Sequence, residues 1–238
     1  LKMKNFFINF KNKMHFQPHV LFIMHPFYFA RRNLYKYYKI YSSKLRGDLI
    51  DIGCGSKPYK ELFKHCKSYI GLEIENENGQ NEADYFYDGN NFPFQNETFD
   101  SAICSEVLEH VFEPKIFLKE VHRILKKDGL IILTLPFFWD EHEQPYDYAR
   151  YTSFGLKYIL EQQNFEVVEQ VKIGNNLSII VQMINCYIYK RLYYKKNLLF
   201  KISSIVMFTI FNFFGVILSL LPKNEDMYLD NLVLAKKK

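Results

Sequence analysis

The sequence predicts an α/β fold built on a doubly wound, mostly parallel β-sheet that is covered by helices. Short apolar segments alternate with amphipathic helical segments from residue 48 to residue 174. The strand segments are apolar on both faces, which is typical of strands buried inside a parallel sheet. A glycine-rich turn follows the first strand, as it does in nucleotide-binding sheets.

The positions of the elements follow from this alternation and from the residues that end helices. We expect strands at residues 48–52, 68–73, 99–104, 130–135, 165–173 and 227–235. We expect helices at residues 31–45, 58–66, 114–126 and 153–163. Gly47 ends the first of these helices, and Pro58 suits the first turn of the second, where its missing N–H has no helical partner.

Composition divides the chain into four parts. They are a basic, aromatic N-terminal extension (residues 1–47), the α/β core (48–174), an apolar and basic helical hairpin (175–223), and a final strand with a basic tail (224–238).

Charge is distributed unevenly along the chain. Residues 48–169 hold 23 acidic and 11 basic side chains, whereas residues 1–47 hold ten basic and no acidic ones. Residues 170–224 again hold no acid and seven bases, which are interleaved with aliphatic runs. Basic, apolar flanks without Gly-rich or Ser-rich tracts favour an anionic membrane surface over nucleic acid as a partner. We therefore expect peripheral contact with such a membrane and no bound nucleic acid.

The cysteines and the N-terminus bear on the compartment. The four cysteines show no C-x-x-C or Cys/His ligand spacing, so we expect a reduced, cytoplasmic protein with no bound metal. Lys11 and Lys13 interrupt the first apolar run and no small-residue cleavage pattern follows, so we expect no signal peptide. The chain begins with Leu1 rather than Met, which leaves a truncated start open.

The turn after the first strand carries the first chemical signal. Residues 53–55 read GCG, and Pro58 stands where a dinucleotide fingerprint has its third glycine. Asp51 lies two residues before the turn, where its carboxylate suits a cationic amino group and does not suit a pyrophosphate. Glu73 ends the next strand 20 residues after Gly53, a spacing that places a carboxylate at the hydroxyls of a bound ribose.

Four segments of the core together resemble class I S-adenosylmethionine-dependent methyltransferases of the small-molecule type 11 family. They are LIDIGCG at residues 49–55, FPFQNETFD at 92–100, SEVLEHV at 105–111 and EVHRILKKDG at 120–129. Their order and spacing, over about half of the chain, make the resemblance specific. It implies a Rossmann-like, mostly parallel sheet of seven strands with the apolar helical insertion before the last strand. It also implies S-adenosylmethionine as the cofactor.

The resemblance further implies which residues hold the cofactor. In this family the glycine turn faces the methionine part, and the acid that ends the second strand holds the ribose. An acid before the FPF segment contacts the adenine amino group, and the residue after the fourth strand lies at the cofactor's edge. The cofactor-binding residues implied in this chain are Asp51, Gly53, Cys54, Gly55, Glu73, Asp88 and Ser105. The chain departs from the family pattern at residues 56–59, which lack the third glycine, and at Asp128, where proline is common.

The segment after the fifth strand, residues 136–152, combines aromatic, acidic and basic side chains. Ligands of doubly wound sheets bind outside the carboxyl ends of the strands, so we expect this segment to face the methyl acceptor. The substrate-binding residues expected are Tyr146, Asp147, Arg150 and Tyr151. An Asp147–Arg150 ion pair that only fixes the loop is an equal alternative. His142 is the candidate base for an oxygen acceptor, whereas His110 is expected to support its loop.

Two apolar segments, residues 177–194 and 198–221, precede the last strand. Residues 202–221 carry no charge and would span ~30 Å as a helix, which is enough for a bilayer. A single span would separate the last strand from the sheet, and a transmembrane hairpin would carry basic residues across the membrane. We therefore favour a hairpin in the membrane interface, with a hairpin buried against the protein as the alternative.

These observations predict an enzyme that moves a methyl group to a small-molecule acceptor by in-line displacement. The basic flanks favour a lipid-linked or glycan-linked acceptor at the inner face of the membrane. A membrane-peripheral binding protein with this fold and no turnover is the first alternative, and the intact Asp51, Gly53 and Glu73 argue against it. An NAD-dependent oxidoreductase is the second alternative, which Pro58 disfavours.

Overall fold

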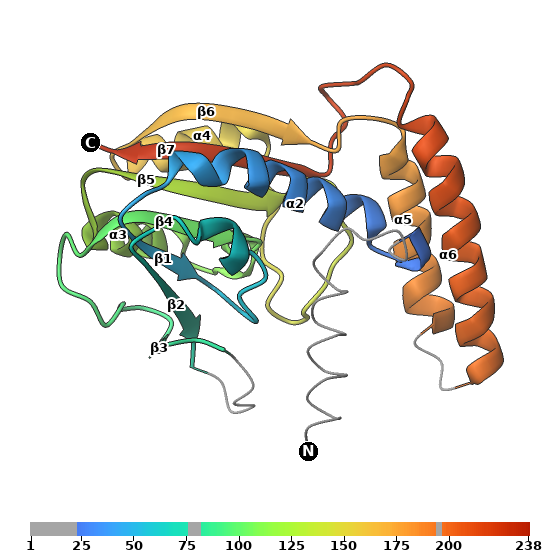
Figure 1. The fold of residues 1–238 in the computed structure, drawn as a ribbon, viewed down its shortest axis with the longest axis horizontal. Helices are drawn as coiled ribbons and strands as arrows, with labels where there is room; N and C mark the ends of the chain where they lie inside the picture. The colour runs from blue at the N-terminus through green and yellow to red at the C-terminus, as the bar shows by residue number, and fades with distance from the viewer. Residues whose placement is uncertain (1–22, 76–81, 194–196) are drawn as a thin grey trace. The chain divides into compact units, whose positions relative to one another are not determined.

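The computed structural model describes residues 23–75, 82–193 and 197–238, which divide into two compact units (Figure 1). The sheet unit consists of residues 38–137, 141–171 and 231–238. The helical unit consists of residues 1–37, of which 23–37 are described, together with residues 138–140 and 172–230. This division follows packing, whereas the four parts expected above follow composition along the chain.

The sheet has seven strands in the order β3-β2-β1-β4-β5-β7-β6. They are β1 (Asp48–Ile52), β2 (Ser68–Ile74), β3 (Tyr85–Tyr87), β4 (Phe99–Ser105), β5 (Leu125–Pro136), β6 (Phe165–Ile173) and β7 (Asp230–Lys237). Every pairing from β3 to β5 is parallel, and Figure 1 shows β7 running opposite to β6. The predicted α/β fold, with a mostly parallel sheet of seven strands, is confirmed.

The strand order turns back at β1, which lies between β2 and β4. From β1 the chain proceeds to β2 and β3 on one side, and then to β4 and β5 on the other. In the register of the sheet, Ile52 is level with Leu72 of β2 and with Cys104 of β4. The carboxyl ends of three strands therefore lie side by side, at the point where doubly wound sheets bind their ligands.

Two helices cover one face of the sheet. α3 (Pro114–Ile124) has a proline in its first turn, where the missing N–H costs no helical hydrogen bond. α4 (Ser153–Gln162) begins after Thr152, whose side chain accepts a hydrogen bond from the Gly155 N–H. The buried side chains of both helices form one apolar core with alternate residues of the strands: Phe117, Leu118, Val121, Leu156 and Leu160 against Ile50, Ile52, Cys104 and Leu133.

Three expectations about the elements differ from the structure. The helix expected at residues 58–66 is wrong, because only a short 3-10 helix, η3 (Lys60–Phe63), forms there. Lys57 has a φ of +52°, which is incompatible with a helix beginning at the turn. β3 was not expected, since three residues are too short to show a period. The helix expected at residues 31–45 begins earlier, as α2 (Tyr28–Tyr41), and ends in a 3-10 turn, η2 (Ser42–Lys44).

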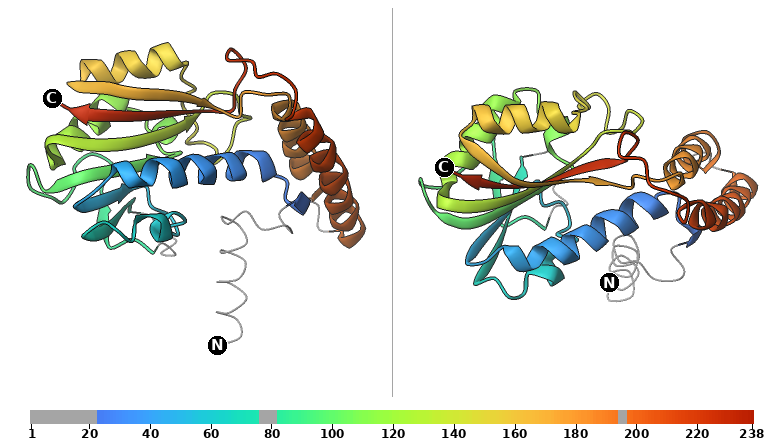
Figure 2. Two further views of the ribbon diagram at one scale, coloured as in Figure 1. Left: turned by 45° about the horizontal axis from the view of Figure 1, so that its top comes forward. Right: turned by 90° about the horizontal axis from the view of Figure 1, so that it is seen from above.

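The helical unit contains the predicted apolar insertion before the last strand. It consists of α5 (Ser178–Ile188), a π-helical turn η5 (Tyr189–Tyr193) and α6 (Leu198–Leu218). Figure 2 shows α5 and α6 side by side in both of its views. Gly215 of α6 lies against Phe29, since a Cβ on Gly215 would come within 2.4 Å of the Phe29 ring. The apolar helical insertion is thus a packed helix pair.

Buried amide side chains join this helix pair to the segment before α2. The Gln182 side chain accepts a hydrogen bond from the Phe29 N–H at 3.2 Å and donates one to the Pro26 carbonyl at 2.9 Å. The Asn212 side chain donates to the Ile23 carbonyl at 2.7 Å. These bonds supply partners to backbone groups at the start of α2 that lack helical ones. They explain why polar residues stand on the buried sides of apolar helices.

Candidate active site

The glycine turn after β1 is fixed by the backbone of β2. The Gly53 and Cys54 N–H groups both donate to the Leu72 carbonyl, at 2.8 and 3.2 Å. Gly53 has a φ of +69°, and a Cβ there would lie 2.3 Å from Cγ2 of Val107. Glycine is therefore required at this position both by the backbone conformation and by the space available.

The second glycine meets the predicted ribose-binding acid. The Gly55 N–H donates to Oε2 of Glu73 at 2.9 Å, and the Ile74 N–H donates to Oε1 at 3.0 Å. A Cβ on Gly55 would meet no heavy atom within 4 Å, so open space lies beside the turn at this point. Each carboxylate oxygen can accept more than one hydrogen bond. Glu73 therefore keeps the capacity to accept from ribose hydroxyls.

Asp51 is buried one residue before the end of β1, with 3% of its surface exposed. Burial is the main cause that raises its pKa to about 7, and the neighbouring carboxylate of Glu73 adds to the effect. A hydrogen bond from the Tyr69 hydroxyl and the charge of Lys57 act in the opposite direction. A buried carboxyl group with a raised pKa gains most from a cationic ligand, as predicted for the amino group of the cofactor.

The buried side chain of Lys57 supports the turn, a role that could not be predicted from the sequence. The Lys57 side chain lies against Gly71, where a Cβ would come within 2.3 Å of Cε. Its Nζ atom donates to Oδ2 of Asp84 at 2.7 Å, and the same oxygen accepts from the Gly71 N–H at 2.7 Å. Cys54 is buried beside this pair, and burial raises the pKa of its thiol to about 12. Cys54 is therefore a neutral packing residue of the turn.

Ser105, at the end of β4, belongs to a network of hydroxyl groups. Its Oγ lies 3.2 Å from Oγ1 of Thr134, which lies 3.3 Å from the Tyr38 hydroxyl. Tyr38 also stacks on Tyr59, with ring centroids 4.1 Å apart. Tyr59 belongs to the segment that directly follows the glycine turn. Its stacking on Tyr38 therefore places the hydroxyl network beside the turn. The sequence signal for Tyr38 was only its place in an aromatic helix.

Asp88 comes directly after β3 and is exposed. Its Oδ1 atom accepts hydrogen bonds from the Asn90 and Asn91 N–H groups at 2.8 Å each. Chiefly the bond from Asn91 holds the pKa of the Asp88 carboxyl below its ordinary value. The structure thus places Asp88 at the same sheet edge as Glu73 but engages one oxygen in a local turn. Its contact with adenine stays a prediction.

The loop after β5 is held by the predicted ion pair. Arg150 donates two hydrogen bonds to the Asp147 carboxylate, at 2.5 and 2.7 Å, and the His142 N–H donates a third at 2.9 Å. Although burial acts to raise it, these bonds lower the pKa of Asp147 to about 2. The bonds to the ionised Asp147 therefore stabilise the folded loop fully above pH ~4. This stabilisation is lost as the pH falls through 2. The geometry favours the structural alternative for Asp147 and Arg150.

The other expected acceptor residues lie at different depths. Tyr146 is 62% exposed, whereas Tyr151 is half-buried and its carbonyl accepts a hydrogen bond from the Asn231 side chain. The imidazole of His142 is half-buried, with Nδ1 3.2 Å from Oδ2 of Asp147. Tyr146 therefore offers the largest accessible surface for contact with an acceptor, and His142, Arg150 and Tyr151 keep part of theirs.

Residues 50–133 match the family model described as a methyltransferase domain, of the type 11 family. The matched residues run from β1 into β5 and include the glycine turn, Glu73 and Ser105. The chain carries a methyltransferase domain of this family. As predicted, this domain is of the S-adenosylmethionine-dependent class. The assignment sets aside the NAD-dependent oxidoreductase.

Similar proteins share this domain or its fold. An uncharacterized protein of Methanocaldococcus jannaschii is 34% identical over 101 residues, which are 40% of this chain and 39% of that protein. The [4+2]-cyclase SpnF has a TM-score of 0.58 at 14% identity, over 87% of this chain and 82% of that chain. A putative sarcosine dimethylglycine methyltransferase from Galdieria sulphuraria has a TM-score of 0.54 at 12% identity, over 88% and 86% of the two chains. The two solved structures share the fold of this chain.

S-adenosylmethionine is the cofactor of the methyltransferase domain, and the residues present fit it. Gly55 leaves open space beside the turn, Asp51 offers a buried carboxyl group, and Glu73 lies against the turn. When bound, this cofactor supplies an electrophilic methyl group on a sulfonium ion. Apart from Asp88, which follows β3, the predicted cofactor-binding residues lie at the carboxyl ends of β1, β2 and β4.

Replacing the two glycines of the turn by alanine is expected to affect different properties, namely stability for Gly53 and cofactor affinity for Gly55. Gly53→Ala adds a clash with Val107 to the ~1–2 kcal/mol cost of a left-handed alanine, so it should lower the unfolding temperature strongly. Gly55→Ala meets no protein atom and should cost only the backbone term. Its Cβ fills the space beside the turn, so affinity for S-adenosylhomocysteine should fall more than tenfold in calorimetry. A folded Gly55→Ala protein with wild-type affinity would contradict the placement of the cofactor.

Cofactor binding is expected to release a proton below pH 7. The pKa of Asp51 is about 7 in the free protein, and an adjacent ammonium group favours the ionised carboxylate. Affinity should therefore rise with pH up to about 7 and level off above it. Calorimetry at pH 6 in buffers of different ionisation enthalpy measures the released proton. Asp51→Asn should bind more weakly and release none, and equal proton release by this variant would exclude Asp51 as the source.

Proposed function

We propose that the protein transfers a methyl group from S-adenosylmethionine to a small-molecule acceptor by in-line displacement. The observation that carries the proposal is the turn at Gly55, where open space adjoins Glu73 and Asp51 within a methyltransferase domain. Because the donor methyl group is already electrophilic, the protein has mainly to hold the acceptor atom in line, ~3 Å from the methyl carbon.

The residues of the chain divide between the donor and the acceptor. Asp51 would fix the amino group of the donor, and Glu73 would fix its ribose. On the acceptor side, Asp147 holds the His142 ring through Nδ1 at 3.2 Å, which presents Nε2 as the proton acceptor for a hydroxyl group. An oxygen acceptor therefore suits this loop.

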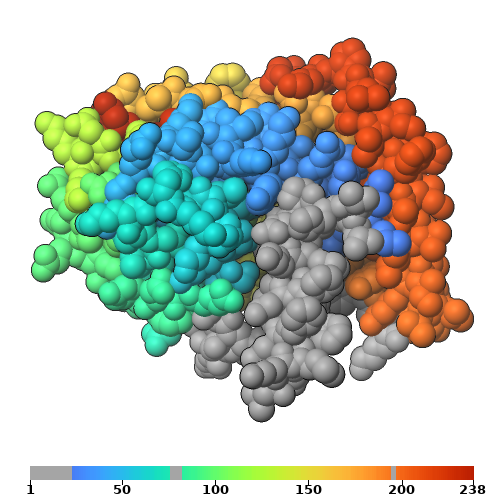
Figure 3. All heavy atoms as spheres, in the orientation of Figure 1, coloured from blue at the N-terminus to red at the C-terminus, as the bar shows by residue number. Residues whose placement is uncertain are grey.

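The exposed side of α6 supports a membrane-bound acceptor. α6 is long and apolar enough to cross a membrane by length and composition, and 22% of its most apolar stretch is buried. Part of its surface is visible in orange-red in Figure 3. Large apolar side chains stand at least half-exposed along it: Leu198, Leu199, Ile202, Val206, Ile210, Phe213 and Phe214. Exposure of such an apolar face to water is unfavourable, and faces of this kind mark interaction sites.

The basic residues of the helical unit favour an anionic surface as the partner of this face. Lys190, Arg191 and Lys201 lie near the connection between α5 and α6, and residues 170–224 hold no acidic side chain. An amphipathic helix pair with such charges lies in the headgroup region. We therefore propose a lipid-linked or glycan-linked acceptor, reached from the cytoplasmic face of the membrane.

Methyl transfer is tested with S-adenosylmethionine that carries a labelled methyl group, added with protein to lipid and aqueous cell extracts. Label should enter the lipid extract, and His142→Ala should lower the rate ~10²-fold or more if His142 is the base. The matched variant His65→Gln, whose ring contacts the Ser42 and Leu45 carbonyls, Cys66 and Phe63 and no residue of the acceptor loop named above, should transfer normally. Label in aqueous products alone would remove the lipid acceptor. Binding of S-adenosylhomocysteine without any transfer would support the binding protein without turnover.

Membrane contact is tested by flotation with vesicles that contain phosphatidylglycerol. The wild type should float, and a triple variant with glutamine at Ile210, Phe213 and Ile217 should not, because these exposed residues share one side of α6. The control variant Phe154→Gln/Tyr158→Gln removes two exposed aromatic rings from α4 of the sheet unit and should float like the wild type. Wild-type protein that stays soluble with and without anionic vesicles would overturn the membrane contact.

A further inference from the structure

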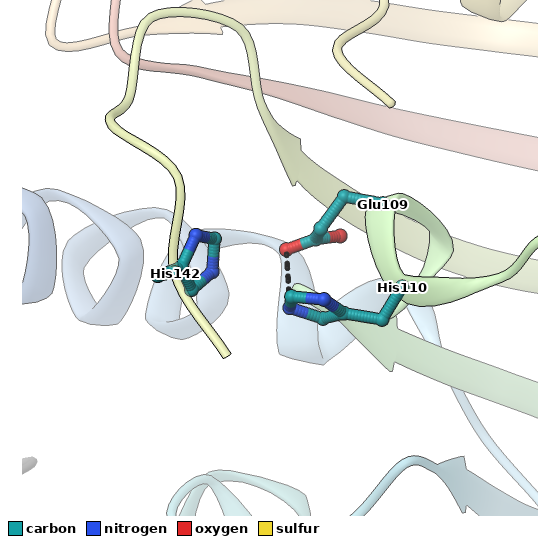
Figure 4. Close-up of side chains that lie close together, drawn as sticks. All are labelled: Glu109, His110 and His142. Atoms are coloured by element: carbon teal, nitrogen blue, oxygen red, sulfur yellow. Dashed lines mark ion pairs between the residues drawn. The ribbon is translucent and has the colours of Figure 1, made fainter. Parts of the chain in front are cut away.

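Three side chains with metal-binding atoms converge beside the acceptor loop. Glu109 and His110 belong to η4 (Leu108–His110), which follows β4, and His142 belongs to the loop after β5. One ligand atom from each lies within 4.8 Å of the others. Figure 4 shows the two imidazole rings and the carboxylate turned toward a common point. The ring centroids of the two histidines are 4.8 Å apart.

The backbone holds the two segments together. The Tyr148 and Ala149 N–H groups both donate to the Glu109 carbonyl, at 2.8 and 3.2 Å. Glu109 is fully buried, and its position is therefore set by the packing of η4 rather than by solvent. The cluster is thus built from a buried carboxylate and a loop that is tied to it.

Each histidine is oriented through its Nδ1 atom. Nδ1 of His110 lies 2.9 Å from the Tyr146 carbonyl oxygen. Nδ1 of His142 lies 3.2 Å from the Asp147 carboxylate and 3.4 Å from Arg150, and we assign the proton toward the closer carboxylate. Histidines that bind metals commonly donate one ring N–H to a carboxylate or a carbonyl, which leaves the other nitrogen as the ligand.

The spacing suits ligands of one ion. Nε2 of His110 lies 3.7 Å from Oε1 of Glu109 and 3.8 Å from Oε2 of Glu143, which is too long for a hydrogen bond. Two atoms that each bind an ion at ~2.1 Å are ~3–4 Å apart. Nearby, Oε1 of Glu106 is buried and accepts no hydrogen bond from any described residue. The charge of Arg150, which is already ion-paired with Asp147, is shared with the carboxylates of Glu106 and Glu109.

We propose that Glu109, His110 and His142 bind a divalent cation. Two imidazole nitrogens and one carboxylate oxygen favour Mn²⁺, Fe²⁺, Co²⁺ or Zn²⁺ over Ca²⁺ and Mg²⁺, which prefer oxygen ligands. This site replaces the expectation, drawn from cysteine spacing, that the protein binds no metal. Three protein ligands leave coordination positions open to a further ligand.

The open positions suit a hydroxyl group of the acceptor, an extension that rests on the proposed function. Coordination lowers the pKa of the hydroxyl, whose proton passes to solvent. The oxygen then forms a bond to the methyl carbon as the S–CH₃ bond breaks. The electron pair of the broken bond stays on sulfur, which gives S-adenosylhomocysteine. In this arrangement His142 is a ligand of the ion rather than the base.

Binding is measured by titrating Mn²⁺ into chelator-treated protein. The electron paramagnetic resonance signal of free Mn²⁺ decreases as the ion binds. The wild type should bind one Mn²⁺ per chain. His110→Ala and His142→Ala should each weaken binding at least tenfold, while His65→Gln, outside the cluster, binds like the wild type. Equal Mn²⁺ binding by the wild type and a His110→Ala/His142→Ala protein would overturn the site.

S-adenosylhomocysteine calorimetry on the same samples separates this proposal from the proposed function. Cluster variants that keep S-adenosylhomocysteine affinity but lose Mn²⁺ confirm folded protein and an independent metal site. Failure of the wild type to bind S-adenosylhomocysteine would instead contradict the proposed function. It would leave the Mn²⁺ result unaffected. Methyl transfer that is unaffected by a chelator would exclude the catalytic role of the ion.

Discussion

The backbone junction between the glycine turn and β2 is the constraint on which the site depends. One carbonyl, that of Leu72, accepts hydrogen bonds from both Gly53 and Cys54, and the next side chain, Glu73, accepts one from Gly55. The parallel register fixes Leu72 level with Ile52, so a slip of one residue would remove all three bonds together. The sheet and the seat of the cofactor are therefore built by the same pairing.

The turn also shows how this chain manages without the family's third glycine. Lys57 adopts a left-handed conformation and carries its side chain beneath Gly71 to Asp84. Burial of the Lys57 ammonium group costs desolvation energy, which its ion pair with the partly exposed Asp84 offsets best when further hydrogen bonds hold the carboxylate. Here the Gly71 N–H provides one to the same carboxylate oxygen. The departure at residues 56–59 thus changes the support of the turn while its ligand-facing side is kept.

Six of the seven strands could be predicted from the sequence because each contains an apolar run bounded by glycine, proline or charge, whereas the three-residue β3 could not. Asp51, Gly55 and Glu73 could be predicted because the strand ends fix their places. The helix at residues 58–66 could not be excluded, since the conformation of Lys57 depends on Asp84, which lies 27 residues away. The approach of His142 to Glu109 depends on backbone bonds between a loop and η4, for which no local pattern exists.

The central claim is that Glu73 and the glycine turn hold a nucleoside with a sulfonium amino acid. Calorimetric titration of the wild type and Glu73→Gln with S-adenosylhomocysteine, and of the wild type with NAD⁺, tests it directly. We expect one molecule of S-adenosylhomocysteine bound per chain, no binding of NAD⁺, and affinity at least tenfold weaker in Glu73→Gln. Unchanged affinity in the variant, or tighter binding of NAD⁺ by the wild type, would contradict it.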